Sequence, residues 1–149
     1  MNAYEFTLSL RIRHPAIDPA EITRALAIEP QHTWKAGEPR RSPADETLAG
    51  TYRESYWMGR LIESPQLSST APTLETVFME TLVQLRRAEP FLASIRDGGG
   101  EAEFHVSLFA RENFRLELAS SLLALLGRLG LAVAFDVYPQ LDGAASAPQ

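Results

Sequence analysis

The chain has 149 residues, of which 45% are hydrophobic and 22% charged, and this length suits one domain with a substantial core. It contains no cysteine, which excludes disulfides, thiol nucleophiles and thiolate metal sites. The 14 Lys and Arg residues against 19 Asp and Glu residues give a net charge of −5, which argues against nonspecific binding to nucleic acid. No segment is apolar enough to predict a membrane span, so the expected location is the cytoplasm.

Alternation of apolar and polar residues near the start of the chain predicts a half-buried strand. Its apolar positions are Phe6, Leu8, Leu10 and Ile12. The next segment predicts a short helix ending near Ala27, because Asp18 suits the N-cap and Pro19 the first helical position. Residues 51–61 are rich in aromatic side chains and predict a second strand. Its apolar residues stand at both odd and even positions, so the sequence does not show which of its faces is buried.

The second half of the chain predicts two helical regions and two strands. Thr73 suits the cap of a helix that Pro90 interrupts, and residues 98–100 are three glycines that predict a turn. Residues 104–108 alternate as a third strand. Asn113 is the expected cap of a leucine-rich helix that ends at Gly130, and the fourth strand, Leu131 to Tyr138, follows at once.

These elements predict an α+β fold, a two-layer α/β sandwich in which helices cover one face of a four-stranded, mostly antiparallel or mixed sheet. The leading topology is a ferredoxin-like split β-α-β arrangement, with the helical residues 73–97 as an extra link. A mixed sheet in another strand order stays open. We expect residues 1–139 to form this single domain and residues 140–149 to form a disordered tail.

Four short motifs stand in order along the chain: DPAEITRALAIEP, HTWKAGEPR, SYWMGRL and GLAVAFDVY. Their combination resembles the bacterial family described as domain of unknown function 4279, whose members have a DP-x-x-I helix followed by a W/Y-K-x-G-x-P loop. The resemblance covers most of residues 4–138 and marks Trp34, Lys35, Gly37 and Pro39 as positions of the family pattern. It supports the α/β architecture and implies no activity, catalytic residue or cofactor.

The segment 28–50 is the candidate contact region, because long connections without clear periodicity are usually functional or disordered. An indole beside cations can clamp an acidic peptide or a planar anion. The alternative is that Trp34 folds back over the core and that the nearby cations are only solvated. The predicted partner-binding residues of this segment and the adjoining strand are Trp34, Lys35, Arg40, Arg41, Tyr56 and Trp57.

The solvent side of the sheet would carry Arg11, Arg13, His105, Ser107, Phe109, Asp136 and Tyr138. The third strand lacks the Gly-aromatic signature of RNA-binding sheets, so we expect no nucleic-acid partner. A triad of Ser107, His105 and Asp136 is disfavoured, because side chains two residues apart on a strand lie about 7 Å from each other. His14, His32 and His105 lack metal-ligand spacing. We therefore expect no catalytic residue, metal or cofactor.

The expected function is a cytoplasmic, non-enzymatic domain that binds another protein in an immunity- or adaptor-like role. The alternative is a small-molecule-binding protein or enzyme with a pocket between the segment 28–50 and the sheet. No membrane partner is expected, and a homo-oligomer stays open. The position of the Trp34 indole, in the core or beside a cleft with polar walls, distinguishes the two roles of the segment.

Overall fold

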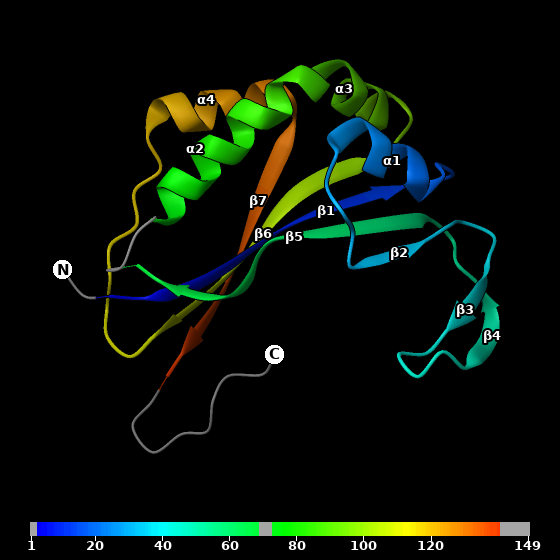
Figure 1. The fold of residues 1–149 in the computed structure, drawn as a ribbon, viewed down its shortest axis with the longest axis horizontal. Helices are drawn as coiled ribbons and strands as arrows, with labels where there is room; N and C mark the ends of the chain where they lie inside the picture. The colour runs from blue at the N-terminus through cyan, green and yellow to red at the C-terminus, as the bar shows by residue number, and fades with distance from the viewer. Residues whose placement is uncertain (1–2, 69–72, 141–149) are drawn as a thin grey trace.

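The computed structural model describes residues 3–68 and 73–140. Within them, the chain forms a five-stranded sheet, a separate two-stranded sheet, four α-helices and one short 3-10 helix. The elements are β1 (Glu5–His14), α1 (Pro19–Leu26), β2 (His32–Trp34), β3 (Pro39–Arg41), β4 (Thr47–Thr51), β5 (Ser55–Leu67), α2 (Leu74–Leu85), η1 (Arg86–Ala88), α3 (Glu89–Asp97), β6 (Glu101–Ala110), α4 (Ser120–Leu129) and β7 (Leu131–Pro139). The four α-helices lie over one face of the large sheet, and none of the described helices covers the other, which we term the open face (Figure 1).

The large sheet has the strand order β2-β5-β1-β6-β7. β1 is antiparallel to both β5 and β6, and β2 is antiparallel to β5. β2 therefore runs parallel to β1 with β5 between them, which is a split β-α-β arrangement connected by α1. β7 runs parallel to β6 and makes the sheet a mixed one.

The predicted number of four strands is wrong, because the large sheet has five. The missed strand is β2, whose three residues are too short to show alternation. The predicted order has the first helix lead into the segment 51–61, whereas α1 leads to β2, and β5 lies between β1 and β2. The helical residues 73–97 connect β5 to β6, and α4 connects β6 to β7.

The core forms where the helices face the even-numbered residues of β1. Phe6, Leu10 and Ile12 have no exposed surface, and Leu8 is 1% exposed. Their counterparts on β6 are Ala102, Phe104, Val106 and Leu108. The helices contribute Ile22, Phe78, Leu82, Leu92, Ile95, Leu122 and Leu126. Full burial of one such large side chain contributes about 1.5–3 kcal/mol, so this layer supplies the main stabilisation of the fold.

The helix ends follow the predicted signals. The side chains of Asp18 and Thr73 accept hydrogen bonds from first-turn backbone N–H groups of α1 and α2. Ala27 and Gly130 end α1 and α4 in the left-handed conformation, with φ values of 56° and 68°. Pro90 stands in the first turn of α3, directly after the 3-10 turn that separates it from α2. These four ends and the proline break are confirmed.

The prediction of Asn113 as a helix cap is wrong. α4 begins at Ser120, and residues 113–119 have no regular secondary structure. In this segment Phe114, Leu116 and Leu118 are half-buried against the core, and a period of two is typical of extended backbone rather than of a helix. The segment is therefore held by alternate side chains, and the helix starts only where the leucine spacing becomes helical.

None of the helices within residues 3–68 and 73–140 combines the length and the apolar character that crossing a bilayer requires. Residues 141–149 of the predicted tail lie outside the described residues. The expectation of a disordered tail thus stays a prediction.

Gly59 is a buried glycine of β5 with no room for a side chain. A Cβ atom at Gly59 would lie 2.7 Å from the Trp57 ring and 2.9 Å from the Ile28 side chain. We expect Gly59→Ala to lower the free energy of unfolding by about 1–3 kcal/mol, because a buried indole cannot move away without losing its packing. Urea denaturation followed by circular dichroism measures the change.

Gly127→Ala is the matched control, because no atom lies within 4 Å of a Cβ at that position of α4. This substitution is expected to leave stability unchanged or to raise it by up to about 1 kcal/mol, since alanine is the better helix former. A Gly59→Ala variant as stable as the parent protein would contradict the tight packing described above.

Candidate functional site

The segment between α1 and β5 is regular, contrary to the expectation of a connection without periodic structure. β2 joins the edge of the large sheet, and β3 and β4 form a hairpin that projects beyond it (Figure 1). Every strand residue of this hairpin is exposed. The hairpin therefore has an ordered backbone without a core of its own.

Gly37 directs the chain from β2 into the hairpin. Its φ of +88° lies in the left-handed region that glycine adopts without strain. Its N–H donates to the Tyr52 carbonyl at 2.9 Å, and the Tyr52 N–H donates to the Glu38 carbonyl at 3.0 Å. The Glu38 carboxylate accepts a hydrogen bond from the Lys35 N–H at 2.9 Å. The W-K-x-G-x-P motif thus forms the neck of the hairpin.

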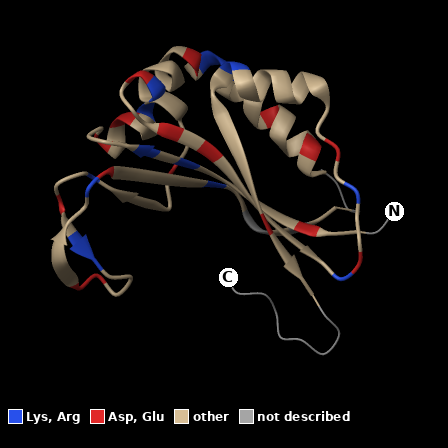
Figure 2. Cartoon of the chain, turned by 180° about the vertical axis from the view of Figure 1, so that it is seen from behind, with Lys and Arg blue, Asp and Glu red and all other residues tan. Residues whose placement is uncertain are grey.

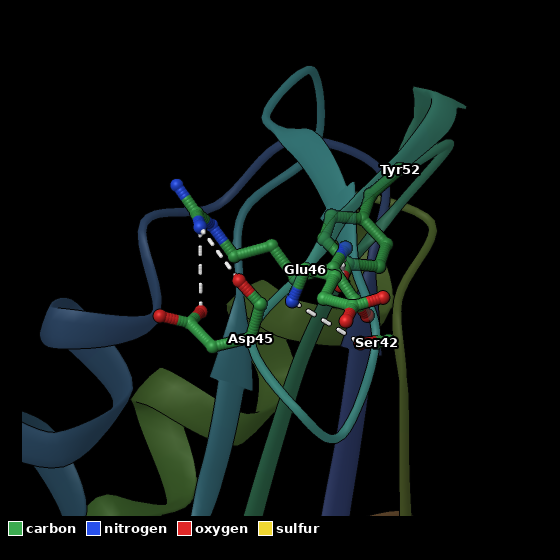
Figure 3. Close-up of polar contacts among 5 residues, drawn as sticks. Ser42, Asp45, Glu46 and Tyr52 are labelled. Atoms are coloured by element: carbon green, nitrogen blue, oxygen red, sulfur yellow. Dashed lines mark hydrogen bonds and ion pairs between the residues drawn. The ribbon is translucent and has the colours of Figure 1, made fainter.

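Hydrogen bonds within the tip of the hairpin fix its shape (Figure 3). The Ser42 N–H donates to the Glu46 carbonyl at 2.8 Å, and the Glu46 N–H donates back to the Ser42 hydroxyl at 3.1 Å. Asp45 has a φ of 61°, and its carboxylate accepts from the Arg41 guanidinium at 3.3 Å. The Arg41 N–H donates to the Tyr52 hydroxyl at 3.1 Å. The tip is therefore tied to the base of the hairpin.

An aromatic stack joins the hairpin to the sheet. The Trp34 indole is stacked with the Tyr52 ring at 4.7 Å and with the Tyr56 ring at 4.4 Å between centroids. The Arg13 guanidinium lies 5.8 Å from the centroid of Tyr56 and pairs with Glu54 at 3.7 Å. Trp34 is half-buried and lies outside the buried core cluster. It is not a lid on the core, and it braces the hairpin against the open face.

The structure separates the six predicted partner-binding residues into three groups. Lys35, Arg40 and Arg41 are exposed, and Trp34 and Tyr56 are half-buried in the aromatic stack. Trp57 has no exposed surface, and its indole N–H donates to the Thr23 hydroxyl at 3.0 Å. Trp57 points to the helix side of the sheet, the opposite side from Tyr56, because adjacent strand residues alternate. It cannot contact a partner, and we remove it from the candidate surface.

Two open grooves border Trp34. One, of about 700 Å³, lies between α1 and β2 and includes Thr23, Arg24 and Lys35 in its walls. The other, of about 500 Å³, lies between β2 and the hairpin and includes Arg41 and Tyr52. The Trp34 indole thus lies beside clefts with polar walls and outside the core cluster.

The predicted polar side of the sheet is the open face. The strand register places Ser107 beside Asp136 and Phe109 beside Tyr138, with Arg11 and Arg13 on the same side of β1. The His105 Nε2 atom lies 2.6 Å from a carboxylate oxygen of Asp136. Sequence reasoning missed Met58 and Arg60, which the register adds to this face. They were missed because the apolar residues of the predicted second strand stand at both odd and even positions, so the sequence does not show which face they share.

The structure gives no metal site to the histidines. Among the described residues, no group of three or more His, Asp or Glu side chains could hold a metal ion. The His14 imidazole accepts backbone hydrogen bonds from Ala16 and Ile17 at 3.0 and 2.9 Å, so it stabilises the turn before α1. His32 is exposed on β2, and His105 pairs with Asp136.

Comparison with known proteins agrees with the resemblance seen in the motifs. A family model described as a domain of unknown function, DUF4279, matches residues 4–140. No curated protein and no solved structure gave a significant match. The matched segment runs from β1 to β7, so it includes both the hairpin and the open face.

We expect Trp34→Ala to loosen the hairpin while the core stays folded. Each ring stack contributes about 0.5–1.5 kcal/mol, and 1.4 kcal/mol corresponds to a factor of ten. Amide hydrogen exchange of the hydrogen-bonded hairpin residues Gly37, Ser42 and Tyr52 should therefore accelerate by about tenfold, with no change in β1 and β6. Mass spectrometry or NMR measures both regions in one experiment.

Tyr138→Ala is the control, because it removes a different stacked pair, with Phe109 at 5.2 Å, near the opposite edge of the sheet. It should leave exchange in the hairpin as it is in the parent protein. Unchanged hairpin exchange in Trp34→Ala would show that the backbone bonds alone hold the hairpin.

Proposed function

This chain belongs to the DUF4279 family, and from the geometry of its hairpin we propose that it is a non-enzymatic domain that binds another protein, in an immunity- or adaptor-like role. The contact region that we propose is the hairpin surface, defined as residues 32–52 together with Tyr56. The partner is expected to be a folded protein or an extended segment with carboxylates and apolar side chains at its surface.

The observation that carries the proposal is an ordered hairpin whose strands β3 and β4 contain no buried residue. Fixing the backbone of one residue costs about 1–2 kcal/mol of conformational entropy, which is normally offset by apolar burial. β3 and β4 are exposed along their whole length, and the aromatic stack and local hydrogen bonds hold them. Such preorganisation lowers the entropic cost of binding, which supports a role in contact with another molecule.

The charges of the hairpin surface suit carboxylates on the partner. Figure 2 shows basic and acidic residues side by side on the hairpin. The Arg41 guanidinium pairs with Asp45, and the Arg40 guanidinium donates to the Ala49 carbonyl at a long 3.4 Å. Both side chains are exposed, and a guanidinium can bind a carboxylate through two parallel hydrogen bonds. Arg40, whose contact is weak, is the side chain that we expect to contribute most.

The edge of the sheet offers a second means of attachment. β2 is the edge strand, and the groove of about 700 Å³ separates it from α1. An extended peptide can add a strand to such an edge and place alternate side chains in the adjacent groove. This mode would combine backbone hydrogen bonds along β2 with contacts to Lys35 and Arg24.

We further propose two finer assignments. The elements from β1 to β6 are interpreted as a ferredoxin-like β-α-β-β-α-β unit with the hairpin inserted before β5, extended by α4 and β7, which is supported by the strand order β2-β5-β1-β6. The cytoplasm is proposed as the location, which is supported by the lack of cysteine.

Site-specific cross-linking tests the hairpin surface. A photoreactive residue replaces Ala44 at the hairpin tip or, as a matched control, the equally exposed Ala124 on α4. We expect one partner to be captured in host cells through position 44 and not through position 124. The captured protein is then purified, and its dissociation constant is measured by calorimetry.

Arginine pairs provide the second arm of this test. The double substitution Arg40→Ala and Arg41→Ala should weaken binding of the purified partner at least tenfold, because arginines in the centre of interfaces are frequent hot spots. The control is Arg86→Ala with Arg87→Ala, an exposed pair on the helix side. Equal loss in both double variants, or cross-linking from position 124 alone, would overturn the proposal.

A further inference from the structure

The open face contains a groove of about 360 Å³ that lies apart from the hairpin surface. Its floor is made of the small hydroxyl side chains of Thr7, Ser9 and Ser107, and its walls include Arg11 and Arg60. The groove forms because short side chains on β1 and β6 lie between long ones on the same face. It is therefore a property of the sheet pattern and not of a loop.

The strand register gathers basic side chains around Ser9. Ser9 is 9% exposed and stands directly between Arg60 of β5 and His105 of β6. Arg11 follows two residues later on the same face of β1, and diagonal neighbours in a sheet lie roughly 7–8 Å apart. Two arginines and one histidine thus surround one small residue. This spacing suits a single carboxylate or phosphate group held above Ser9.

Arg11 carries a donor without an acceptor. Its Nε–H is buried, and within the described residues it has no hydrogen-bond partner. Buried polar groups are nearly always hydrogen-bonded, so an unsatisfied one requires an explanation, of which a bound ion is one. The unsatisfied donor shows that the protein does not fully satisfy the Arg11 side chain, and the same side chain lines the groove.

Two acidic side chains border the basic ones on the open face. The Asp136 carboxylate has a hydrogen-bond partner in the His105 Nε2 atom at 2.6 Å, and the imidazole is mostly buried, with 15% of its side chain exposed. Glu103 is the register neighbour of Arg11 on β6. The anionic group of a ligand would therefore bind beside these carboxylates and rely on Arg11 and Arg60 together.

The other end of the groove is aromatic and apolar. The Phe109 and Tyr138 rings stack at 5.2 Å, and Ile62 and Pro65 line the same groove, whereas Met58 is the register partner of Arg11. Phe109 is four positions after His105 on β6, so their Cα atoms lie roughly 13 Å apart along the strand. The ligand must therefore carry its ring at a distance from its charged group.

We propose that this groove binds a small organic anion of mononucleotide size, in which a linker joins a planar ring to a phosphate or a carboxylate. Arg11, Arg60 and the Ser9 hydroxyl bind the anionic group. The ring packs against Phe109 and Tyr138 at the other end. This site is separate from the hairpin surface and does not depend on the function proposed there.

Calorimetric titration of the full chain tests the site with defined probes. The ring-bearing probes are the four nucleoside 5′-monophosphates and indole-3-butyrate, and they distinguish a phosphate from a carboxylate ligand. Inorganic phosphate and adenosine each supply one half of the proposed ligand. We expect at least one ring-bearing probe to bind at least tenfold more tightly than either half. Equal affinity for inorganic phosphate, or no binding of any ring-bearing probe, would overturn the proposal.

A single-stranded RNA oligomer is the remaining probe, because aromatic residues on an open sheet can also stack bases of a polymer. Binding of the oligomer without binding of any monophosphate would overturn the small-ligand proposal.

Arg11→Met separates a ligand-binding role from a structural one. Methionine keeps most of the apolar stem and removes the unpartnered donor, so the melting temperature should stay the same or rise while binding of the best probe weakens at least tenfold. Arg13→Met is the matched control on the same face of β1, outside the groove, and it should leave the dissociation constant unchanged. A folded Arg11→Met protein that binds as tightly as the parent, or a marked fall in melting temperature, would overturn the assignment of Arg11.

Discussion

Burial of the even-numbered side chains of β1 under the helices determines the two faces of the whole sheet. β1 is the central strand and pairs with both β5 and β6. The alternation of its side chains therefore determines which residues of both neighbours face the helices. A slip of one residue would turn Arg11 and Arg13 towards the core and bring apolar side chains to the surface. The large energetic difference between these registers keeps the polar residues of three strands on one open face. Both candidate sites depend on this register.

The parts of the fold that could be predicted are those with a repeated local signal. Apolar and polar residue types alternate over the centres of β1 and β6, and α1 has both a cap and a proline at its start. β5 could be placed only approximately, since Met58 is nearly buried on the open face while Trp57 is buried on the other. β1 and β5 also shift register near Leu8, which breaks the alternation further. Sequence periodicity therefore cannot show where such an irregular strand begins and ends, or which of its faces is buried.

The candidate sites could be predicted only in part for a related reason. The seven residues placed on the polar side of the sheet are on the open face, because strand alternation alone decides their direction. The sequence indicates Trp34 only as a candidate contact residue, and its place in the stack depends on Tyr52 and Tyr56, which are brought to it by the hairpin and by β5. The role of Arg11 depends on Ser9 and Arg60 across a strand boundary. Such contacts arise from strand order, which no local pattern specifies.

The net charge of −5 makes the arginines of the open face informative. Arg13 has the carboxylate of Glu54 beside it, whereas the Nε–H of Arg11, two residues earlier, is buried without a partner among the described residues. Glu103 is the register neighbour of Arg11 on β6. The Nε–H of Arg11 therefore lacks an acceptor although a carboxylate stands on the adjacent strand and the chain is rich in acidic residues. Structural stability alone would favour satisfying or replacing the donor.

β5 links the hairpin surface to the groove on the open face, because Tyr56 belongs to the aromatic stack and Arg60, on the same face, belongs to the groove. The pairing of β5 with β1 is continuous from Tyr56 to Arg60, so no register shift separates the two regions along this strand.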